Sequence, residues 1–242
     1  MNVPGWVRRI VGTRAGPPAP DAPLYVIGDI HGCPDLLERL VARFDPALPV
    51  VCLGDYVDRG PDSAAVLRWL MARPEITCLK GNHEAMLLEF LKDPTRRGRR
   101  WLRFGGLETL ASFGLTGAPD PSDATALRDL RDGLAEAMGA GTLAWLEALP
   151  ARHLTGNVAV VHAGADPACP VADQPDGTLI WGHPDFGRKR RSDGIWVVYG
   201  HVIHPEPRMA RGCIALDTGA YATGRLSAAR LDPSGKVTFL ST

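Results

Sequence analysis

The sequence predicts an α/β fold in which two β-sheets pack face to face, as a β-sandwich flanked by helices. Three observations support this prediction. Short apolar runs alternate with helical periodicity up to about residue 91, which is typical of a parallel sheet built from strand–helix units. Strand-like runs return after residue 157 with few helices between them, which indicates a second, mixed or antiparallel sheet. The intervening segment 93–150 is predicted to be a helical insertion.

The first half of the chain contains three strand–helix units. In each unit an apolar run of about four residues is followed by a segment whose apolar residues recur at helical spacing. Right-handed crossover connections would make the three strands parallel. The strands are expected at 24–27, 50–53 and 76–79, and the helices at 35–44, 62–73 and 84–91.

The second half begins with the helical insertion, where helices are expected near 123–138 and 142–148. The segment 12–23, rich in Gly, Pro and Ala, leads us to interpret residues 1–23 as a flexible leader before one domain, 24–242. The later strands are expected at 158–161, 179–181, 196–199, 213–216, 225–231 and 237–240.

Composition excludes several classes of protein. The chain has 242 residues, of which 45% are apolar and 22% charged, as in soluble globular domains. The formal net charge is zero, so no global field would attract nucleic acid or an anionic membrane. Neither a membrane-spanning segment nor a signal peptide is expected, and the five scattered cysteines do not indicate a disulfide framework. A cytoplasmic location fits best.

Polar residues follow each of the first three predicted strands. Asp29, Asp55 and Asn82 stand 26 residues (29 to 55) and 27 residues (55 to 82) apart, which is about one strand–helix unit. In open α/β sheets the ligand site lies at the carboxyl ends of the strands. The period of the fold therefore brings these three side chains to one edge of the sheet.

Four short segments contain the candidate chemistry. They are GDIHG (28–32), GDYVDRG (54–60), GNHE (81–84), and two histidines, His162 and His201, that follow later apolar runs. Oxygen and nitrogen donors without a thiolate suit manganese, iron or zinc. A carboxylate can bridge two cations, and two cations about 3.5–4 Å apart can hold the attacking and leaving oxygens of a phosphoryl group. The segments therefore predict a binuclear metal centre.

These motifs, in this order and spacing, resemble the metal-dependent phosphoprotein phosphatase family, part of the calcineurin-like metallophosphoesterase superfamily. The resemblance covers roughly residues 24–231, and the segments 101–114 and 216–220 are similar to the bacterial and phage branch. It implies the metallophosphoesterase-type two-sheet sandwich and a catalytic domain. It also implies metal-dependent hydrolysis of phosphomonoesters, above all of phosphoserine and phosphothreonine in proteins.

The resemblance implies a role for each matching residue. His83 would be the general acid, Asp58 would orient it, and Arg59 would bind phosphate oxygens. The nucleophile would be a metal-bridging hydroxide that attacks phosphorus directly, without a phosphoenzyme. The two metals would be manganese by preference, with iron or zinc as alternatives. Their ligands would be Asp29 and His31 for the first metal, Asp55 as the bridge, and Asn82, His162 and His201 for the second.

One position departs from the family pattern. The family usually places a second phosphate-binding arginine shortly after a Trp in this part of the chain, whereas here Trp181 is followed by Gly182 and His183. His183 is therefore the candidate second phosphate ligand. An arginine or lysine of the basic run 188–191 is the alternative.

Blander interpretations compete for several residues. Singly, each Asp could be a turn residue and each His a core residue, but four histidines at strand ends favour a site. The basic runs 96–100 and 188–191 are interpreted as solvated surface, and anion binding is the alternative interpretation. Trp101, Phe104 and Phe113 are expected in the core of the insertion and not as a platform for base stacking.

Other functions compete with protein dephosphorylation. Diadenosine tetraphosphate hydrolases share the scaffold but tend to have alanine in place of Asp58 and aspartate in place of Glu84, which favours a phosphatase here. A nonenzymatic metal-binding protein would be expected to lose His83 or a ligand, and none is lost. Neutral charge and the lack of a recognised module argue against nucleic acid. The expected partner is a phosphorylated protein or a small phosphoester.

Overall fold

The structure of the protein is a computed structural model that describes residues 16–117 and 120–242, so residues 1–15 of the predicted leader lie outside the described residues. The strands are β1 (Leu24–Ile27), β2 (Val50–Cys52), β3 (Thr77–Cys78), β4 (Arg152–Thr155), β5 (Val158–Val161), β6 (Trp196–Tyr199), β7 (Arg208–Ala210), β8 (Cys213–Ala215), β9 (Ser227–Leu231) and β10 (Val237–Ser241). The helices are α1 (Pro34–Val41), α2 (Ser63–Met71), α3 (Asn82–Lys92), α4 (Pro94–Trp101), α5 (Leu107–Ser112), α6 (Ala124–Ala148), α7 (Asp176–Trp181) and α8 (Ala220–Thr223), with a π-helical turn η2 (Leu102–Gly106) and a 3-10 turn η3 (Val171–Asp173).

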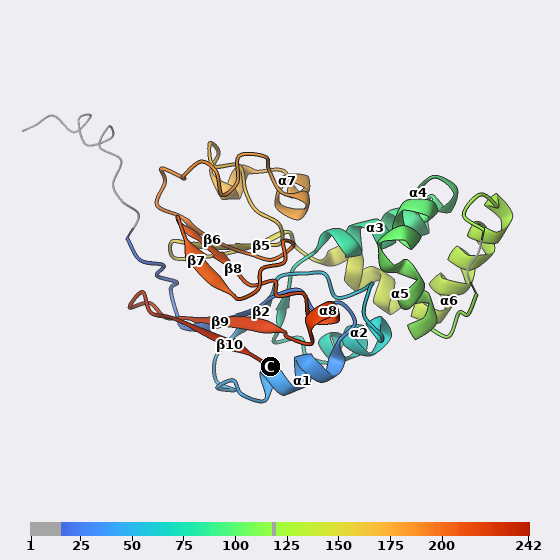
Figure 1. The fold of residues 1–242 in the computed structure, drawn as a ribbon, viewed down its shortest axis with the longest axis horizontal. Coiled ribbons are helices and arrows are strands. Elements are labelled where there is room, and N and C mark those ends of the chain that lie inside the picture. Colours follow the sequence, from blue (N-terminus) through green and yellow to red (C-terminus); the bar gives the residue numbers. More distant parts are fainter. Residues whose placement is uncertain (1–15, 118–119) are drawn as a thin grey trace, which may run out of the picture.

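Two five-stranded sheets lie face to face (Figure 1). The strand order is β10-β9-β1-β2-β3 in the first sheet and β4-β5-β6-β8-β7 in the second. Three neighbouring strands of each sheet are parallel, namely β1, β2 and β3 in one and β5, β6 and β8 in the other, and the remaining strands are antiparallel. The predicted α/β fold with two packed sheets is confirmed, and the second sheet is mixed.

The parallel strands are apolar at almost every position because both of their faces are buried. In β1, Val26 packs between the two sheets while its neighbour Ile27 packs under the helices of the outer face. In β5, Val160 likewise faces the other sheet and Val161 faces the side of α7. Burying each such side chain contributes roughly 1.5–3 kcal/mol, so the strands and their carboxyl ends are firmly placed.

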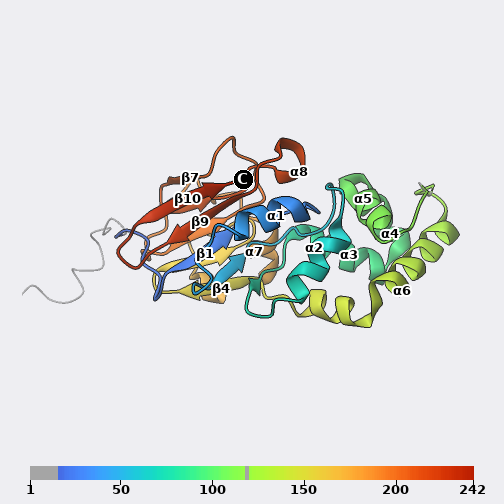
Figure 2. The same cartoon turned by 90° about the horizontal axis from the view of Figure 1, so that it is seen from below.

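Helices α1 and α2 cover the outer face of the first sheet (Figure 2). Helix α1 begins with Pro34, whose missing N–H costs nothing in a first helical turn. Helix α2 is capped by Asp62, whose carboxylate accepts a hydrogen bond from the Ala65 N–H at 2.8 Å. The buried side chains of Leu37 and Leu40 attach α1 to the sheet.

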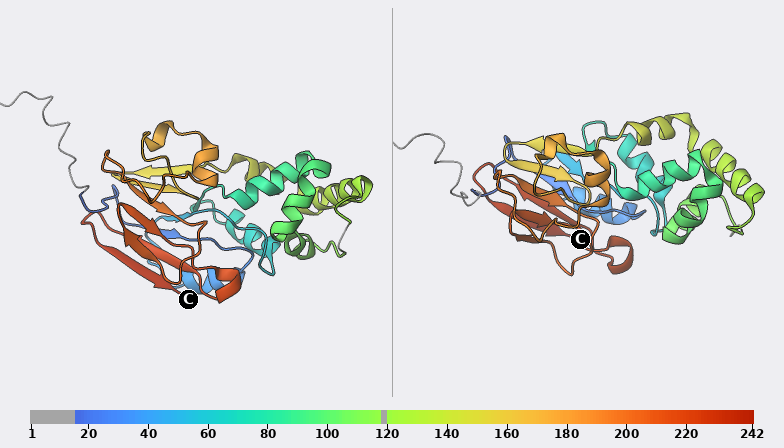
Figure 3. Two further views of the ribbon diagram at one scale, coloured as in Figure 1. Left: turned by 45° about the horizontal axis from the view of Figure 1, so that its top comes forward. Right: turned by 90° about the horizontal axis from the view of Figure 1, so that it is seen from above.

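The segment predicted as a helical insertion forms α4, η2, α5 and α6, which extend from one end of the two sheets (Figure 3). Gly139 has φ +73° and interrupts α6. The two helices expected at 123–138 and 142–148 are therefore the two arms of one kinked element. The π-helical turn η2 lies in the middle of the Trp-to-Gly segment 101–114, and it faces the site described below.

Three expectations about the strands are wrong. Residues 179–181 end helix α7 instead of forming a strand, because a short apolar run reads the same in a buried helix; Leu179 and Ile180 pack on the second sheet. Strands β9 and β10 form where they were expected but join the first sheet, where β9 pairs with β1. The edge strands β4 and β7 were not predicted, because their polar sequences RHLT and RMA carry no apolar alternation.

The described part of the predicted leader, 16–23, lies against the second sheet. The Trp196 indole N–H donates to the Gly16 carbonyl at 2.7 Å, and the Ala19 N–H donates to the Asn157 amide oxygen at 2.6 Å. These bonds hold the chain just before β1. None of the described helices is both long enough and apolar enough to cross a membrane.

Candidate metal centre and active site

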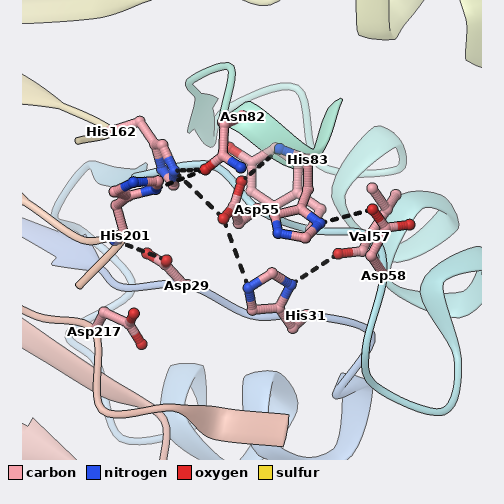
Figure 4. A network of polar contacts seen from close by, with 12 residues as sticks. Asp29, His31, Asp55, Val57, Asp58, Asn82, His83, His162, His201 and Asp217 are labelled. Carbon is pink, nitrogen blue, oxygen red and sulfur yellow. Dashed lines mark hydrogen bonds and ion pairs between the residues drawn. The ribbon is translucent and has the colours of Figure 1, made fainter. Parts of the chain in front are cut away.

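Side chains from both sheets converge at the carboxyl ends of the parallel strands (Figure 4). Asp29 follows β1, Asp55 follows β2, and Asn82 opens helix α3 just after β3. From the second sheet, His162 follows β5 and His201 follows β6. The structure thus brings together the residues that the sequence predicts as metal ligands, and their role as ligands stays a prediction.

Five of the predicted site residues have an uncommon backbone conformation. Among the described residues, only six other than glycine have positive φ, and five of them are His31, Asp55, Asp58, Arg59 and His201. A left-handed backbone costs an ordinary residue of the order of 1 kcal/mol and persists only where the surrounding fold enforces it. Every one of these five is a predicted site residue, so the strain is concentrated at the site.

Backbone carbonyls fix the orientation of two histidines. The Nδ1–H of His31 donates to the Val57 carbonyl at 2.8 Å, and that of His162 donates to the Leu53 carbonyl at 3.1 Å. Each Nε2 points towards the cluster, 3.6 Å and 3.3 Å from Asp55 Oδ2. This outer hydrogen bond is the arrangement found in metal-ligating histidines. Burial lowers the pKa of His31 to about 3, which keeps it neutral, whereas at His162 burial is outweighed by the charge of Asp55, which raises the pKa to about 9.

The carboxylates of the cluster repel one another. Burial, and then the charges of Asp217 and Asp55, raise the pKa of Asp29 well above its ordinary value. Asp29 Oδ2 accepts the His201 N–H at 2.8 Å, but Oδ1 is buried without a hydrogen-bond partner. An added Cβ at Gly200 would lie 1.9 Å from that oxygen, so only glycine leaves room for it. An orphaned, buried carboxylate oxygen is the feature expected of a cation ligand.

Two groups of donors share one carboxylate. His31, Asp55 and His83 form the first, and Asp55, His162 and His201 form the second, with the donor atoms of each group within 4.8 Å of one another. Asn82 joins the second group: its Oδ1 lies 2.9 Å from His162 Nε2 and 2.7 Å from His201 Nδ1. The two groups could hold two cations with Asp55 as a shared ligand, and their oxygen and nitrogen donors suit manganese, iron or zinc.

His83 also belongs to a second, separate interaction. Its Nδ1 lies 2.7 Å from Asp58 Oδ2, and both side chains are buried. The other ring nitrogen faces the space beside Asp55 and His31 (Figure 4). Burial lowers the pKa of His83, but the carboxylates of Asp55 and Asp58 outweigh it and raise the pKa above its ordinary value. A histidine whose protonated form is favoured by neighbouring carboxylates is suited to be a proton donor.

The insertion supplies the groups that hold Asp58. The Trp101 indole N–H donates to Asp58 Oδ1 at 3.0 Å, and the Thr109 hydroxyl donates to the same oxygen at 2.7 Å. The Asp58 N–H lies 2.9 Å from Thr109 Oγ1 and 3.0 Å from Ser63 Oγ. Trp101 stacks on Phe90 with ring centroids 4.5 Å apart and is fully buried, as expected of a core residue. The same expectation is wrong for Phe104, which is 44% exposed. No sequence pattern indicates that the Trp101 N–H binds the Asp58 carboxylate.

Arg59 is positioned by the same part of the chain. Its backbone N–H donates to the Gly105 carbonyl at 3.2 Å, and a Cβ at Gly105 would lie 2.6 Å from that nitrogen. Gly105 itself has φ +108°, which favours glycine independently. The guanidinium lies over the ring of Tyr221, 5.2 Å from its centroid, and Tyr221 also meets the His31 ring edge to face. Arg59 is thus held beside the cluster with its donors available to an anion.

A family model described as calcineurin-like phosphoesterase matches residues 22–205, which is most of the chain. The chain belongs to the calcineurin-like phosphoesterase family.

Similar proteins carry two kinds of name. The chain is 31% identical over 218 residues to serine/threonine-protein phosphatase 1 of Salmonella typhimurium, covering 86% of this chain and 91% of that one. It is 44% identical over 86 residues to serine/threonine-protein phosphatase 2 of Escherichia coli, a match that covers 34% of this chain and only 38% of that relative. A crystal structure described as a proposed diadenosine tetraphosphatase is 26% identical, with a TM-score of 0.63 over 93% of this chain and 95% of that one.

The candidate second phosphate ligand of this phosphoesterase belongs to neither donor group. His183 follows α7, and its Nε2 lies 3.7 Å from Asp166 Oδ2, with about a quarter of the side chain exposed. Of the alternatives, Arg191 donates to the Asp166 and Cys169 carbonyls and pairs with Asp193, so it braces a loop. Lys189 pairs with Asp185 at 2.8 Å. The phosphate role of His183 stays a prediction.

Glu84 has a structural role that its motif does not reveal. It is fully buried, and its carboxylate accepts the backbone N–H groups of Asp55, Tyr56 and Gly81 at 2.7–2.9 Å. It therefore ties the loop after β2 to the start of α3. In the sequence, Glu84 serves only to distinguish phosphatases from diadenosine tetraphosphate hydrolases. No sequence pattern assigns a role to Asp217, Tyr221 or Thr109.

Replacing Thr109 by valine tests the clamp on Asp58. The change keeps the shape of the side chain but removes one donor to the carboxylate and one acceptor for the Asp58 N–H. We expect kcat for phosphate esters to fall roughly 10-fold, because Asp58 no longer holds His83 in one orientation. KM should change little. Steady-state kinetics of the metal-loaded protein measure both.

Ser112→Ala is the matched control. Ser112 lies on the same helix, donates to the Thr109 carbonyl at 2.7 Å and accepts the Ala64 N–H, but it does not touch Asp58. It should destabilise the protein by a similar amount while leaving kcat near the wild-type value. Equal losses of kcat in the two variants would show that Thr109 acts only through stability.

Proposed function

We propose that the chain is a metal-dependent phosphomonoesterase whose substrates are phosphoserine and phosphothreonine in proteins. The observation that carries the proposal is the buried His83–Asp58 pair beside the shared carboxylate Asp55. Hydrolysis of an alkyl phosphate expels a poor leaving group, a serine or threonine alkoxide, which needs a proton. A rigidly held histidine is the group that supplies one.

Each residue has a part in the proposed reaction. Arg59 binds two oxygens of the phosphate through its planar fork. His83 donates a proton to the departing oxygen from the nitrogen that faces the cluster. Asp58 accepts a hydrogen bond from the other ring nitrogen and stabilises the charged ring before the transfer. Two cations at this site, for which we propose manganese, would activate a water molecule and stabilise the charge on phosphate. Asp29, His31, Asp55, Asn82, His162 and His201 would hold them.

Two further facts support a phosphatase of this kind. The relative aligned over 91% of its own length is named a serine/threonine-protein phosphatase. Asp58, whose place tends to be taken by alanine in diadenosine tetraphosphate hydrolases, is held here by Trp101 and Thr109 from the insertion. Because Asp58 is fully buried and bound by several groups, we infer that its carboxylate has a specific role in the site.

Hydrolysis of diadenosine tetraphosphate is the second candidate. It is favoured by the solved structure described as a proposed diadenosine tetraphosphatase. It is also favoured by three aromatic side chains near the site, Phe104, Trp181 and Tyr221, each more than a third exposed. Exposed aromatic faces can stack on a nucleotide base.

A comparison of two substrates decides between the candidates. We expect the protein, stripped of metal and reloaded with manganese, to hydrolyse a phosphothreonine peptide with a kcat/KM at least about 10-fold above that for diadenosine tetraphosphate, a factor equivalent to roughly 1.4 kcal/mol. Release of inorganic phosphate and chromatography of nucleotides measure the two reactions. A preference for the dinucleotide would contradict the proposed substrate and retain the metal chemistry.

The dependence on leaving group tests the role of His83. In His83→Asn we expect kcat for a phosphothreonine peptide to fall by roughly 10²–10⁴-fold, because the alkoxide leaves without a proton. The loss for p-nitrophenyl phosphate should be much smaller, since that leaving group is stable as an anion. Bound manganese, measured by elemental analysis, should stay at the wild-type level.

Two results would contradict this role. An equal loss for both esters would mean that His83 does not protonate the leaving group. A loss of metal in step with activity would make His83 a ligand, as its place in the first donor group also allows.

A further inference from the structure

Positive charge is concentrated on one part of the insertion. The chain as a whole has 27 basic and 27 acidic residues, so a local excess of one sign is not set by composition. Helix α4 and the π-helical turn η2 nevertheless contain five arginines within eight residues, at 96, 97, 99, 100 and 103. No acidic residue stands between positions 94 and 107.

Four of these arginines lie together. Together with Phe104 they line one surface pocket of about 330 Å³, and their spacing of three, four and seven residues from the first places them on one helical face. All four are exposed, and among the described residues none of them forms an ion pair. We call Arg96, Arg99, Arg100 and Arg103 the arginine stripe.

Arg97 differs from its neighbours. It is also exposed, but it lies outside the pocket and pairs with Glu89 on α3 at 3.5 Å. This part of the structure therefore has one arginine whose charge is partly neutralised by an ion pair, beside four that form no ion pair with the described residues.

The stripe leads to the phosphate-binding part of the site. Its last member, Arg103, and Phe104 directly precede Gly105, whose carbonyl accepts the Arg59 N–H. Arg103 is therefore the member of the stripe next to Arg59, two residues along the chain from the Gly105 carbonyl that binds its backbone. Within the stripe, the Arg100 guanidinium lies over the ring of Trp181, 4.8 Å from its centroid. The stripe therefore also faces the end of α7.

We propose that the arginine stripe binds acidic side chains that flank the phosphorylated residue of a peptide substrate, a proposal that rests on the proposed function. From Arg96 to Arg103 the stripe is about 10 Å long, at 1.5 Å of rise per residue. An extended peptide covers that length with about three residues. Arginine forks bind carboxylates in pairs of hydrogen bonds, so four guanidiniums fit a short run of Asp or Glu.

The shape of the stripe favours a peptide over a nucleotide. The four charges are spread along an exposed helical face, and Phe104 is the one aromatic residue that lines the pocket. A segment with a carboxylate at each residue matches such a spread. A polyphosphate chain is the competing ligand of like charge, and the experiment below separates the two.

The test compares two phosphothreonine peptides with the manganese-loaded protein. One carries three glutamates next to the phosphothreonine, and the other carries three glutamines at the same positions. The pair is made twice, with the three residues before the phosphothreonine or after it. We expect kcat/KM for the acidic peptide to exceed that for the neutral one by roughly 5–20-fold at low salt, as two to three exposed ion pairs would give. The ratio should fall at high salt.

Two variants locate the effect. In the double variant Arg96→Ala and Arg99→Ala the acidic-to-neutral ratio should fall clearly towards one, because two of the four charges are gone. The matched control, Arg97→Ala, removes a charge of the same kind on the same helix and should keep the wild-type ratio. Fluorescence anisotropy of a labelled, unphosphorylated acidic peptide gives a readout apart from turnover: wild type and Arg97→Ala should bind it equally, and the double variant should bind it more weakly.

The outcomes distinguish a failure of the acidic-peptide proposal from a failure of the proposed function. If both peptides are hydrolysed with equal kcat/KM by wild type, or if the double variant keeps the preference, the stripe is not an acidic-peptide site and the proposed function stands. If neither peptide is hydrolysed while diadenosine tetraphosphate is, both proposals are overturned. A double variant that loses kcat/KM for the tetraphosphate alone would assign the stripe to polyphosphate instead.

Discussion

Repulsion among buried carboxylates is the constraint on which the site depends. Asp29, Asp55 and Asp217 meet below the surface, and Asp29 Oδ1 has no hydrogen-bond donor. Such an arrangement is costly in a low-dielectric interior unless positive charge is supplied. The fold maintains it by converging the carboxyl ends of two packed sheets and by holding His31, Asp55 and His201 in left-handed backbone conformations. Backbone carbonyls of Val57 and Leu53 orient His31 and His162 towards this cluster.

The insertion connects this chemistry to selectivity. One face of it reaches inward, where Trp101 and Thr109 bind the carboxylate of Asp58 and the carbonyl of Gly105 binds the Arg59 N–H. Another face of the same short segment carries the arginine stripe. A change in the insertion can therefore alter both the proton donor and the surface that a substrate meets, although no residue of it is a candidate metal ligand.

Much of the fold and the site could be predicted because burial and chemistry leave clear patterns. Strands β1, β5 and β6 are apolar on both faces, and the sequence locates each at its observed bounds. Where a pattern is weak or ambiguous, prediction failed: α7 reads as a strand, and β7 is exposed throughout. The clamp on Asp58 could not be predicted, because a tryptophan that packs on Phe90 and one that also donates to a distant carboxylate have the same sequence pattern.

The dependence of stability on metal tests the central claim most directly. The free energy of unfolding is measured by denaturant titration at several fixed concentrations of free manganese above saturation, for wild type and for Asp55→Asn. Two bound ions predict an increase of about 2.7 kcal/mol for each tenfold rise in free manganese, twice the value for one ion. Asp55→Asn, which lacks the shared carboxylate, should show a much smaller slope. A wild-type stability that does not change with manganese, or that rises with the slope of one ion, would contradict a two-cation centre.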